Sequence, residues 1–110
     1  MYAHQTKLAS EEVQDLRREG GRYLRERREA RGLSQRQLAA LIGVEYYTFV
    51  SQIETGRGRI PPDSYRIWAE ALGVEAREFV RNLMRYYDPV THDILFADTG
   101  AANLTAANVA

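Results

Sequence analysis

The chain has 110 residues, of which 45% are apolar, and its 15 Lys and Arg balance its 15 Asp and Glu. This length fits one small domain, which buries too little surface to enclose a deep catalytic cleft. The absence of Cys excludes disulfides, thiol nucleophiles and Cys-bound zinc, and the two histidines, His4 and His92, lie in opposite terminal segments without the spacing of a metal site.

The first segment, residues 1–19, is predicted to be a helical extension. Ser10 is a suitable N-cap because two glutamates follow it in the first turn. Gly20 and Gly21 disfavour a helix interior, so a break or bend is expected there before a helix resumes over residues 22–31.

The same segment carries four acidic residues and lacks the apolar run of a signal peptide. Uninterrupted apolar stretches elsewhere in the chain are only a handful of residues long, which is too short for a bilayer span. We therefore expect a cytoplasmic protein that does not contact a membrane.

Two short helices are predicted in the middle of the chain, with a turn that begins at Gly43. Ser34 and Gln37 have the spacing of a capping box, which predicts a helix over residues 35–42. A second helix is expected over about residues 47–55. Its outward positions carry uncharged hydrogen-bonding side chains where a merely solvated helix would carry Lys and Glu. This face is therefore expected to contact another molecule.

Two further helices are expected before residue 88. Pro61-Pro62-Asp63 predicts a helix start, and Trp68 lies on the apolar stripe that follows, so it is expected in the core. The next helix should run from about Ala76 to Tyr87, and dimer contacts are expected from this helix or from the N-terminal one. The apolar stripe proposed for the contact consists of Phe79, Leu83 and Met84.

The segment 89–110 is predicted to be a flexible tail. Asp88-Pro89 is expected to end the preceding helix, and the residues that follow contain one apolar cluster, Ile94-Leu95-Phe96, and then mainly small residues. We expect this tail to be mobile unless a partner orders it.

The zero net charge conceals an uneven distribution. Residues 20–59 hold eight Arg and four Glu, an excess of four positive charges, while the segments on both sides are slightly acidic. Fourteen of the fifteen basic residues are Arg, whose planar side chain suits phosphate and guanine. Solvated helix faces with ion pairs one turn apart would explain these charges equally well.

Several short motifs follow one another in the middle of the chain: Leu24, Arg28, Gly32-Leu33-Ser34-Gln35, Leu38-Ala39, Gly43-Val44, Ser51-Gln52-Ile53-Glu54-x-Gly56 and Trp68-Ala69-x-Ala71-Leu72-Gly73-Val74. In this order residues 22–74 resemble the Cro and lambda-repressor-like regulators, also called the XRE family. The turn before the second motif helix is one residue longer than the commonest spacing in that family.

The resemblance implies an all-α fold: a compact lambda-repressor-like helix-turn-helix bundle of four to five helices. Here it would have an extra N-terminal helix, an extra C-terminal helix and a mobile tail. Residues 20–74 would be the DNA-binding domain, and residues 75–88 a C-terminal helix available to a dimer or another partner. The second motif helix would enter the major groove of DNA.

Projected onto this sequence, the resemblance assigns candidate roles to ten residues. The candidates for base contacts are Tyr47, Thr48, Ser51 and Gln52, for phosphate contacts Gln35, Arg36, Arg57 and Arg59, and for a structural ion pair Arg28 and Glu54. Packing at the helix entrance is the alternative for Tyr46 and Tyr47, and solvation is the alternative for the arginines.

The sequence therefore predicts a bacterial or phage transcriptional regulator that binds double-stranded DNA specifically, as a homodimer associated with the nucleoid. The alternative is a protein-interaction module or antitoxin-like adaptor that uses the helix-turn-helix shell and the C-terminal helix and tail to bind another protein. We expect neither an enzyme, because no catalytic set of residues is apparent, nor a cofactor or metal.

Overall fold

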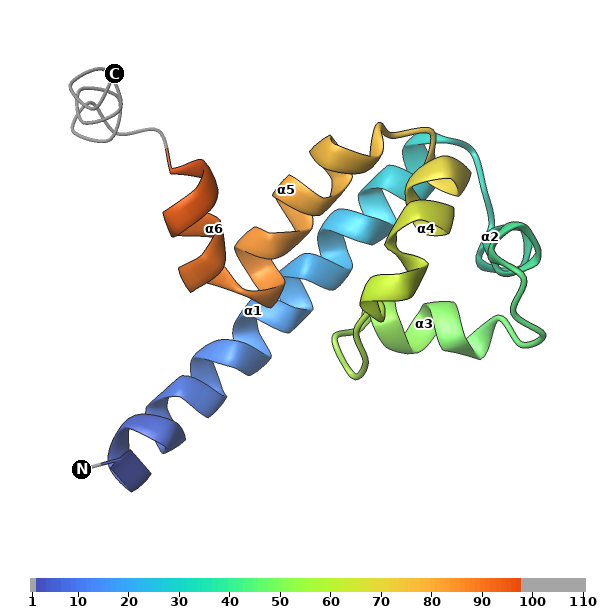
Figure 1. Ribbon diagram of the computed structural model, residues 1–110. Coiled ribbons are helices and arrows are strands. Elements are labelled where there is room, and N and C mark those ends of the chain that lie inside the picture. Colours follow the sequence, from blue (N-terminus) through green and yellow to red (C-terminus); the bar gives the residue numbers. More distant parts are fainter. Residues whose placement is uncertain (1, 98–110) are drawn as a thin grey trace, which may run out of the picture.

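One long helix, α1 (Tyr2–Ala30), forms the axis against which the other helices pack in the computed structural model, which describes residues 2–97 (Figure 1). Helix α5 lies along one side of α1, and α6 folds back against α5. Helices α2, α3 and α4 gather on the other side. Their bounds are α2 (Gln35–Ile42), α3 (Thr48–Glu54), α4 (Tyr65–Leu72), α5 (Ala76–Tyr87) and α6 (Pro89–Phe96), with a 3₁₀ turn, η1 (Pro62–Ser64), before α4.

The described chain is all-helical, with the helix-turn-helix bundle that the sequence predicts. Every helix from α1 to α5 contributes fully buried side chains to one core, since apolar residues recur at helical spacing in each. Trp68 is 1% exposed and is the largest of them, which confirms its predicted place in the core. The other fully buried large side chains are Phe79, Leu24, Leu38, Ile53, Ile60, Leu72, Leu83 and Val50.

The helix starts and stops predicted around the motif are confirmed. Ser34 accepts a hydrogen bond from the Gln37 backbone N–H at 3.0 Å, and the Gln37 side chain accepts one from Ser34 N–H at 2.8 Å, which completes the capping box. Gly43 ends α2 in the left-handed conformation, with φ of 78°. Helix α3 begins at Thr48, within one residue of the expected start, and α5 has the expected bounds.

The expected break at Gly20-Gly21 is wrong, because α1 continues through both glycines. A Cβ atom on Gly21 would lie 2.2 Å from the carbonyl oxygen of Glu54, at the end of α3, and one on Gly20 would lie 2.9 Å from Cβ of Tyr86 in α5. The two glycines therefore let neighbouring elements approach the backbone of α1. The pair of glycines in the sequence marks a site of close contact and not a bend in the helix.

The expectation of a flexible tail from residue 89 is wrong for residues 89–96, which form α6. The Asp88 carboxylate caps this helix by accepting hydrogen bonds from the Thr91 backbone N–H at 3.1 Å and the Thr91 hydroxyl at 2.7 Å. These bonds, with a smaller effect of the Arg59 charge, lower the pKa of Asp88 below its ordinary value. Pro89 ends α5 and also begins α6, a position that suits its fixed φ. Residues 98–110 lie outside the described part.

The apolar stripe of α5 that was expected to form dimer contacts lies inside the bundle instead of on its surface. Phe79 and Leu83 are fully buried inside the bundle and Met84 is half-buried, so the stripe packs within one chain.

Elsewhere in the described C-terminal region, Val90, Ile94 and Leu95 of α6 are 67%, 77% and 64% exposed. No helix among residues 2–97 combines the length and the apolar character needed to cross a bilayer.

Candidate nucleic-acid interface

Helix α3 has one face fixed in the core and one face open to solvent. Val50 and Ile53 are buried against the other helices, which orients the remaining side chains of this short helix outward. Thr48 and Gln52 are exposed, Ser51 is half-buried, and Tyr47 at the N-cap is 39% exposed. The four residues predicted for base contacts therefore share the outward side of α3 and its entrance, and none of them is charged.

A buried ion pair fixes the far end of α3 to α1. Arg28 Nε donates to Glu54 Oε2 at 2.6 Å and Arg28 Nη2 to Glu54 Oε1 at 3.0 Å, and both residues are only 8% exposed. Arg28 Nη1 also donates to the Leu33 carbonyl at 2.7 Å, so the guanidinium joins α1 to the end of α3 and to the segment just before α2. The hydrogen bonds to Glu54 are the main reason that the pKa of Arg28 is raised. Such two-point pairing fixes geometry as well as distance.

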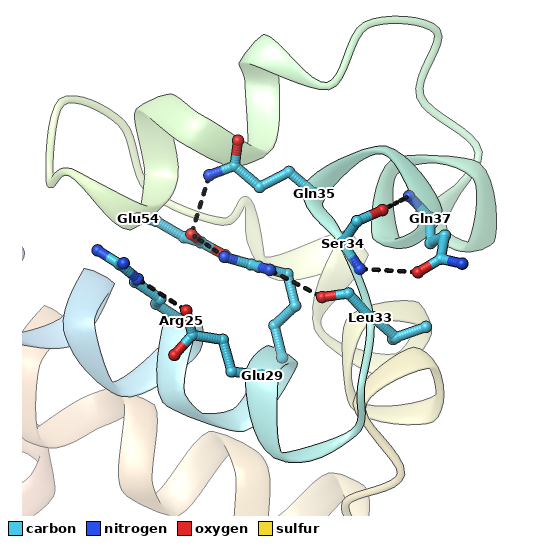
Figure 2. A network of polar contacts seen from close by, with 8 residues as sticks. Arg25, Glu29, Leu33, Ser34, Gln35, Gln37 and Glu54 are labelled. Carbon is cyan, nitrogen blue, oxygen red and sulfur yellow. Dashed lines mark hydrogen bonds and ion pairs between the residues drawn. The ribbon is translucent and has the colours of Figure 1, made fainter.

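Gln35 joins the same network from the first turn of α2. Its Nε2 donates to Glu54 Oε1 at 3.1 Å, and Figure 2 shows its amide turned toward that carboxylate. Gln35 is half-buried and lies directly after the Ser34 N-cap, beside the unpaired N–H groups of the helix start. One amide hydrogen is engaged by Glu54, and the second can still be donated outward.

Arg36 and Tyr47 lie on opposite sides of the turn between the motif helices and touch each other. The Arg36 guanidinium carbon is 4.5 Å from the centroid of the Tyr47 ring, within the range of a cation–π contact. Tyr46, for which packing was the alternative, is 67% exposed. The structure thus brings one candidate phosphate residue against one candidate base residue at the entrance of α3.

Arg57 and Arg59 lie in the loop after α3, and both are exposed. The loop is fixed to the end of α3 because the backbone N–H groups of Arg57 and Gly58 donate to the Gln52 carbonyl, at 2.9 and 3.2 Å. The Arg59 guanidinium carbon lies 4.6 Å from the centroid of the Tyr87 ring. Exposed arginines therefore lie at both ends of the outward face of α3.

Tyr87 was not among the sequence-predicted site residues, although it contacts this loop twice. Besides the ring contact with Arg59, its hydroxyl accepts a hydrogen bond from the Ile60 backbone N–H at 3.0 Å. Burial raises the pKa of Tyr87 above its ordinary value of 10.0, so the hydroxyl stays neutral. Its position at the end of α5 gave no signal in the sequence, because the contact joins segments 27 residues apart.

Comparison with known proteins identifies the arrangement. A family model described as helix-turn-helix matches residues 24–79, about half of the chain. The chain belongs to this helix-turn-helix family. The match contains both motif helices, the buried ion pair and the loop with Arg57 and Arg59. A protein of this helix-turn-helix family with this architecture is a DNA-binding transcription regulator.

A solved structure supports the assignment to the helix-turn-helix family. The chain is 38% identical to the restriction-modification controller protein C.AhdI from Aeromonas hydrophila, with a TM-score of 0.52. The similarity covers 59% of this chain and 96% of the controller protein. A search of curated proteins finds no match.

Proposed function

We propose that the chain regulates transcription by placing α3 in the major groove of a specific double-stranded DNA site. The observation that carries the proposal is the outward face of α3, which offers hydroxyl and amide groups and is held by buried contacts at its other face. The major groove is wide enough for one helix, and its base edges present both donors and acceptors. A rigid helix with uncharged polar side chains is suited to that pattern.

With α3 placed in the major groove, each candidate residue is proposed to contact a particular part of the DNA. Gln52 is proposed to pair with adenine through its amide, and Tyr47, Thr48 and Ser51 are proposed to contact neighbouring bases. Arg36, Arg57 and Arg59 are proposed to contact phosphates on both sides of the groove. Gln35 would donate its second amide hydrogen to a phosphate while Glu54 holds the first.

We further propose that the regulator acts as a homodimer and resides in the cytoplasm, at the nucleoid. One short helix reads too few bases to select a site, and paired half-sites multiply the selectivity. The similarity to a protein named as a restriction-modification controller supports a role in controlling transcription rather than in catalysis. No observation favours the alternative of an adaptor that binds only proteins.

The proposal is tested by selecting bound sequences from a pool of randomised duplexes and titrating the selected duplex by fluorescence anisotropy. Gln52→Ala is expected to weaken binding by about 1–3 kcal/mol and to relax the preference at one base pair. Arg57→Ala is expected to weaken binding to all sequences alike and to reduce the magnitude of the salt slope by about one per protomer, because it removes one phosphate contact from each protomer.

Thr55→Ala is a suitable control, because Thr55 is exposed at the end of α3 but its hydroxyl donates to the Gln52 carbonyl in its own helix. Its effect should be small. A wild-type chain that binds no duplex in dilute buffer would refute the proposed function. Equal loss of sequence preference in the Gln52 and Arg57 variants would refute the assigned roles.

A further inference from the structure

Tyr87 makes two polar contacts with the loop that follows α3, in addition to its packing against the core. It is half-buried at the end of α5, and it touches both the side chain of Arg59 and the backbone of Ile60, two consecutive residues of the loop that follows α3. Ile60 is fully buried, so the hydrogen bond from its N–H to the Tyr87 hydroxyl fixes a point of the loop that is already anchored.

The ring contact then restricts the neighbouring side chain. A free Arg side chain samples many rotamers, and ordering it on DNA costs conformational entropy. A guanidinium stacked on a ring keeps its N–H donors in the plane of the group, directed away from the ring, so stacking leaves the donors available. Within residues 10–97 no carboxylate forms a salt bridge with Arg59.

The two arginines of this loop differ in this respect. Among the described side chains, Arg59 has an aromatic partner and Arg57 has none, although both are exposed and only two residues apart. The charge of Arg59 also acts on Asp88, the residue after Tyr87. The end of α5 therefore contacts Arg59 through the Tyr87 ring, and Arg57 has no such contact within the described residues.

From these contacts we infer that Tyr87 is a positioning residue for DNA binding, which orders the Arg59 side chain before it meets a phosphate. The inference rests on the proposed function. It assigns a role in DNA affinity to a residue that itself lies at the far end of α5, outside α3 and outside the match to the family model. Tyr87 supports affinity through Arg59 and touches no nucleotide itself.

The test is a double-mutant cycle on the full chain, with anisotropy titrations on the selected duplex and on a random-sequence duplex of equal length. Arg59→Ala is expected to reduce the magnitude of the salt slope by about one per protomer. Tyr87→Leu is expected to lower affinity by about two- to fivefold, the strength of one exposed cation–π contact. In the Arg59→Ala background, Tyr87→Leu should have no further effect, while in the Arg57→Ala background its effect should persist in full.

Two variants separate positioning from general damage. Tyr86→Leu removes the neighbouring ring, which stacks on Tyr23 with centroids 5.9 Å apart, and should leave DNA affinity unchanged at temperatures where the protein is folded. Tyr87→Phe keeps the ring and should retain most of the affinity. Circular dichroism under the titration conditions establishes that each variant is folded.

If Tyr87→Leu does not fold, NMR spectra of the wild-type chain test the contact between Arg59 and Tyr87 directly. The Cδ protons of Arg59 in the wild-type chain should show an upfield ring-current shift in NMR spectra, whereas those of Arg57 should not. Absence of that shift, or equal effects of Tyr87→Leu in the Arg59→Ala and wild-type backgrounds, would overturn the inference. Failure of the wild-type chain to bind any duplex would instead overturn the proposed function, so the two failures are distinguishable.

Discussion

At the scale of single residues, the Arg28–Glu54 pair and the Arg25–Glu29 pair show how burial changes the value of an ion pair. Both arginines lie on α1, and Figure 2 shows the Arg25–Glu29 pair and the Glu54 side chain. The side chains of the first pair are 10% and 3% exposed, and those of the second are 62% and 54% exposed. Water can replace the partner in the exposed pair but not in the buried one.

Arg28→Met is therefore expected to lower the free energy of unfolding by about 3–5 kcal/mol, because it leaves the Glu54 carboxylate buried without its partner. Arg25→Met should change it by less than about 1 kcal/mol. Urea unfolding followed by circular dichroism measures both. The double variant Arg28→Met/Glu54→Met should recover a large part of the loss, and a result in which Arg28→Met is no worse than Arg25→Met would contradict this account.

At the scale of elements, the contact between α1 and α3 depends on glycines from both sides. Gly21 lies against the Glu54 carbonyl, and Gly56, with φ of 83°, lies so close to α1 that a Cβ atom there would be 2.8 Å from the Arg18 backbone nitrogen. Backbone atoms of the two segments thus approach each other directly. This contact fixes the position of the end of α3 against α1.

Gly21→Ala tests this contact. Alanine is the better helix former by about 1 kcal/mol. Nevertheless, we expect a net loss of about 1–3 kcal/mol in the free energy of unfolding, since α3 must move away from the added methyl group. Glu19→Ala, at an exposed site in the same helix, should change stability by less than about 0.5 kcal/mol. Chemical denaturation decides, and a Gly21→Ala chain as stable as the wild type would exclude the close contact.

Local signals in the sequence predicted most of the helices, since each depends on neighbouring residues. The capping box at Ser34 and Gln37 and the apolar stripe around Trp68 are of this kind. The errors arose where a residue serves a distant or double purpose. Gly21 was interpreted as a helix breaker because the Glu54 carbonyl that requires a glycine there is 33 positions away in the sequence. Pro89 was interpreted only as the end of the preceding helix, although it also begins α6.

For the site, the sequence suggested the side chains but not the contacts among them. The resemblance predicted the Arg28–Glu54 pairing, and the structure places the two side chains in contact. Gln35 was predicted to contact a phosphate, and the hydrogen bond from its amide to Glu54 was not predicted. The contacts of Arg36 with the Tyr47 ring and of Arg59 with the Tyr87 ring depend on how the elements pack, which no spacing along the chain encodes.

At the scale of the whole molecule, a chain with zero net charge is proposed to bind a polyanion. The excess of positive charge in residues 20–59 makes this possible, because it is concentrated in the segment that contains both motif helices. Attraction to phosphates is a local effect, since charges more than about 10 Å apart are largely screened at moderate salt. Acidic residues elsewhere then weaken binding only slightly.

The slope of log K against log salt measures the number of phosphates neutralised. Three arginines in each protomer, Arg36, Arg57 and Arg59, would make six contacts in a dimer, and at about 0.9 per contact the slope should be about −5. A monomer would give about −3. Anisotropy titrations over a salt series measure the slope, with sedimentation velocity on the same samples. The triple Gln variant at these positions should retain its helical content with a slope near zero, and a steep slope in that variant would refute the assignment.

The unbroken course of α1 has a mechanical consequence. With 29 residues it is a rod about 43 Å long, whose first turns project past the rest of the bundle in Figure 1. The same helix binds the Glu54 side chain through Arg28 and contacts the end of α3 at Gly21. The projecting turns thus belong to the same rigid element that holds the end of α3, the helix proposed to enter the DNA groove.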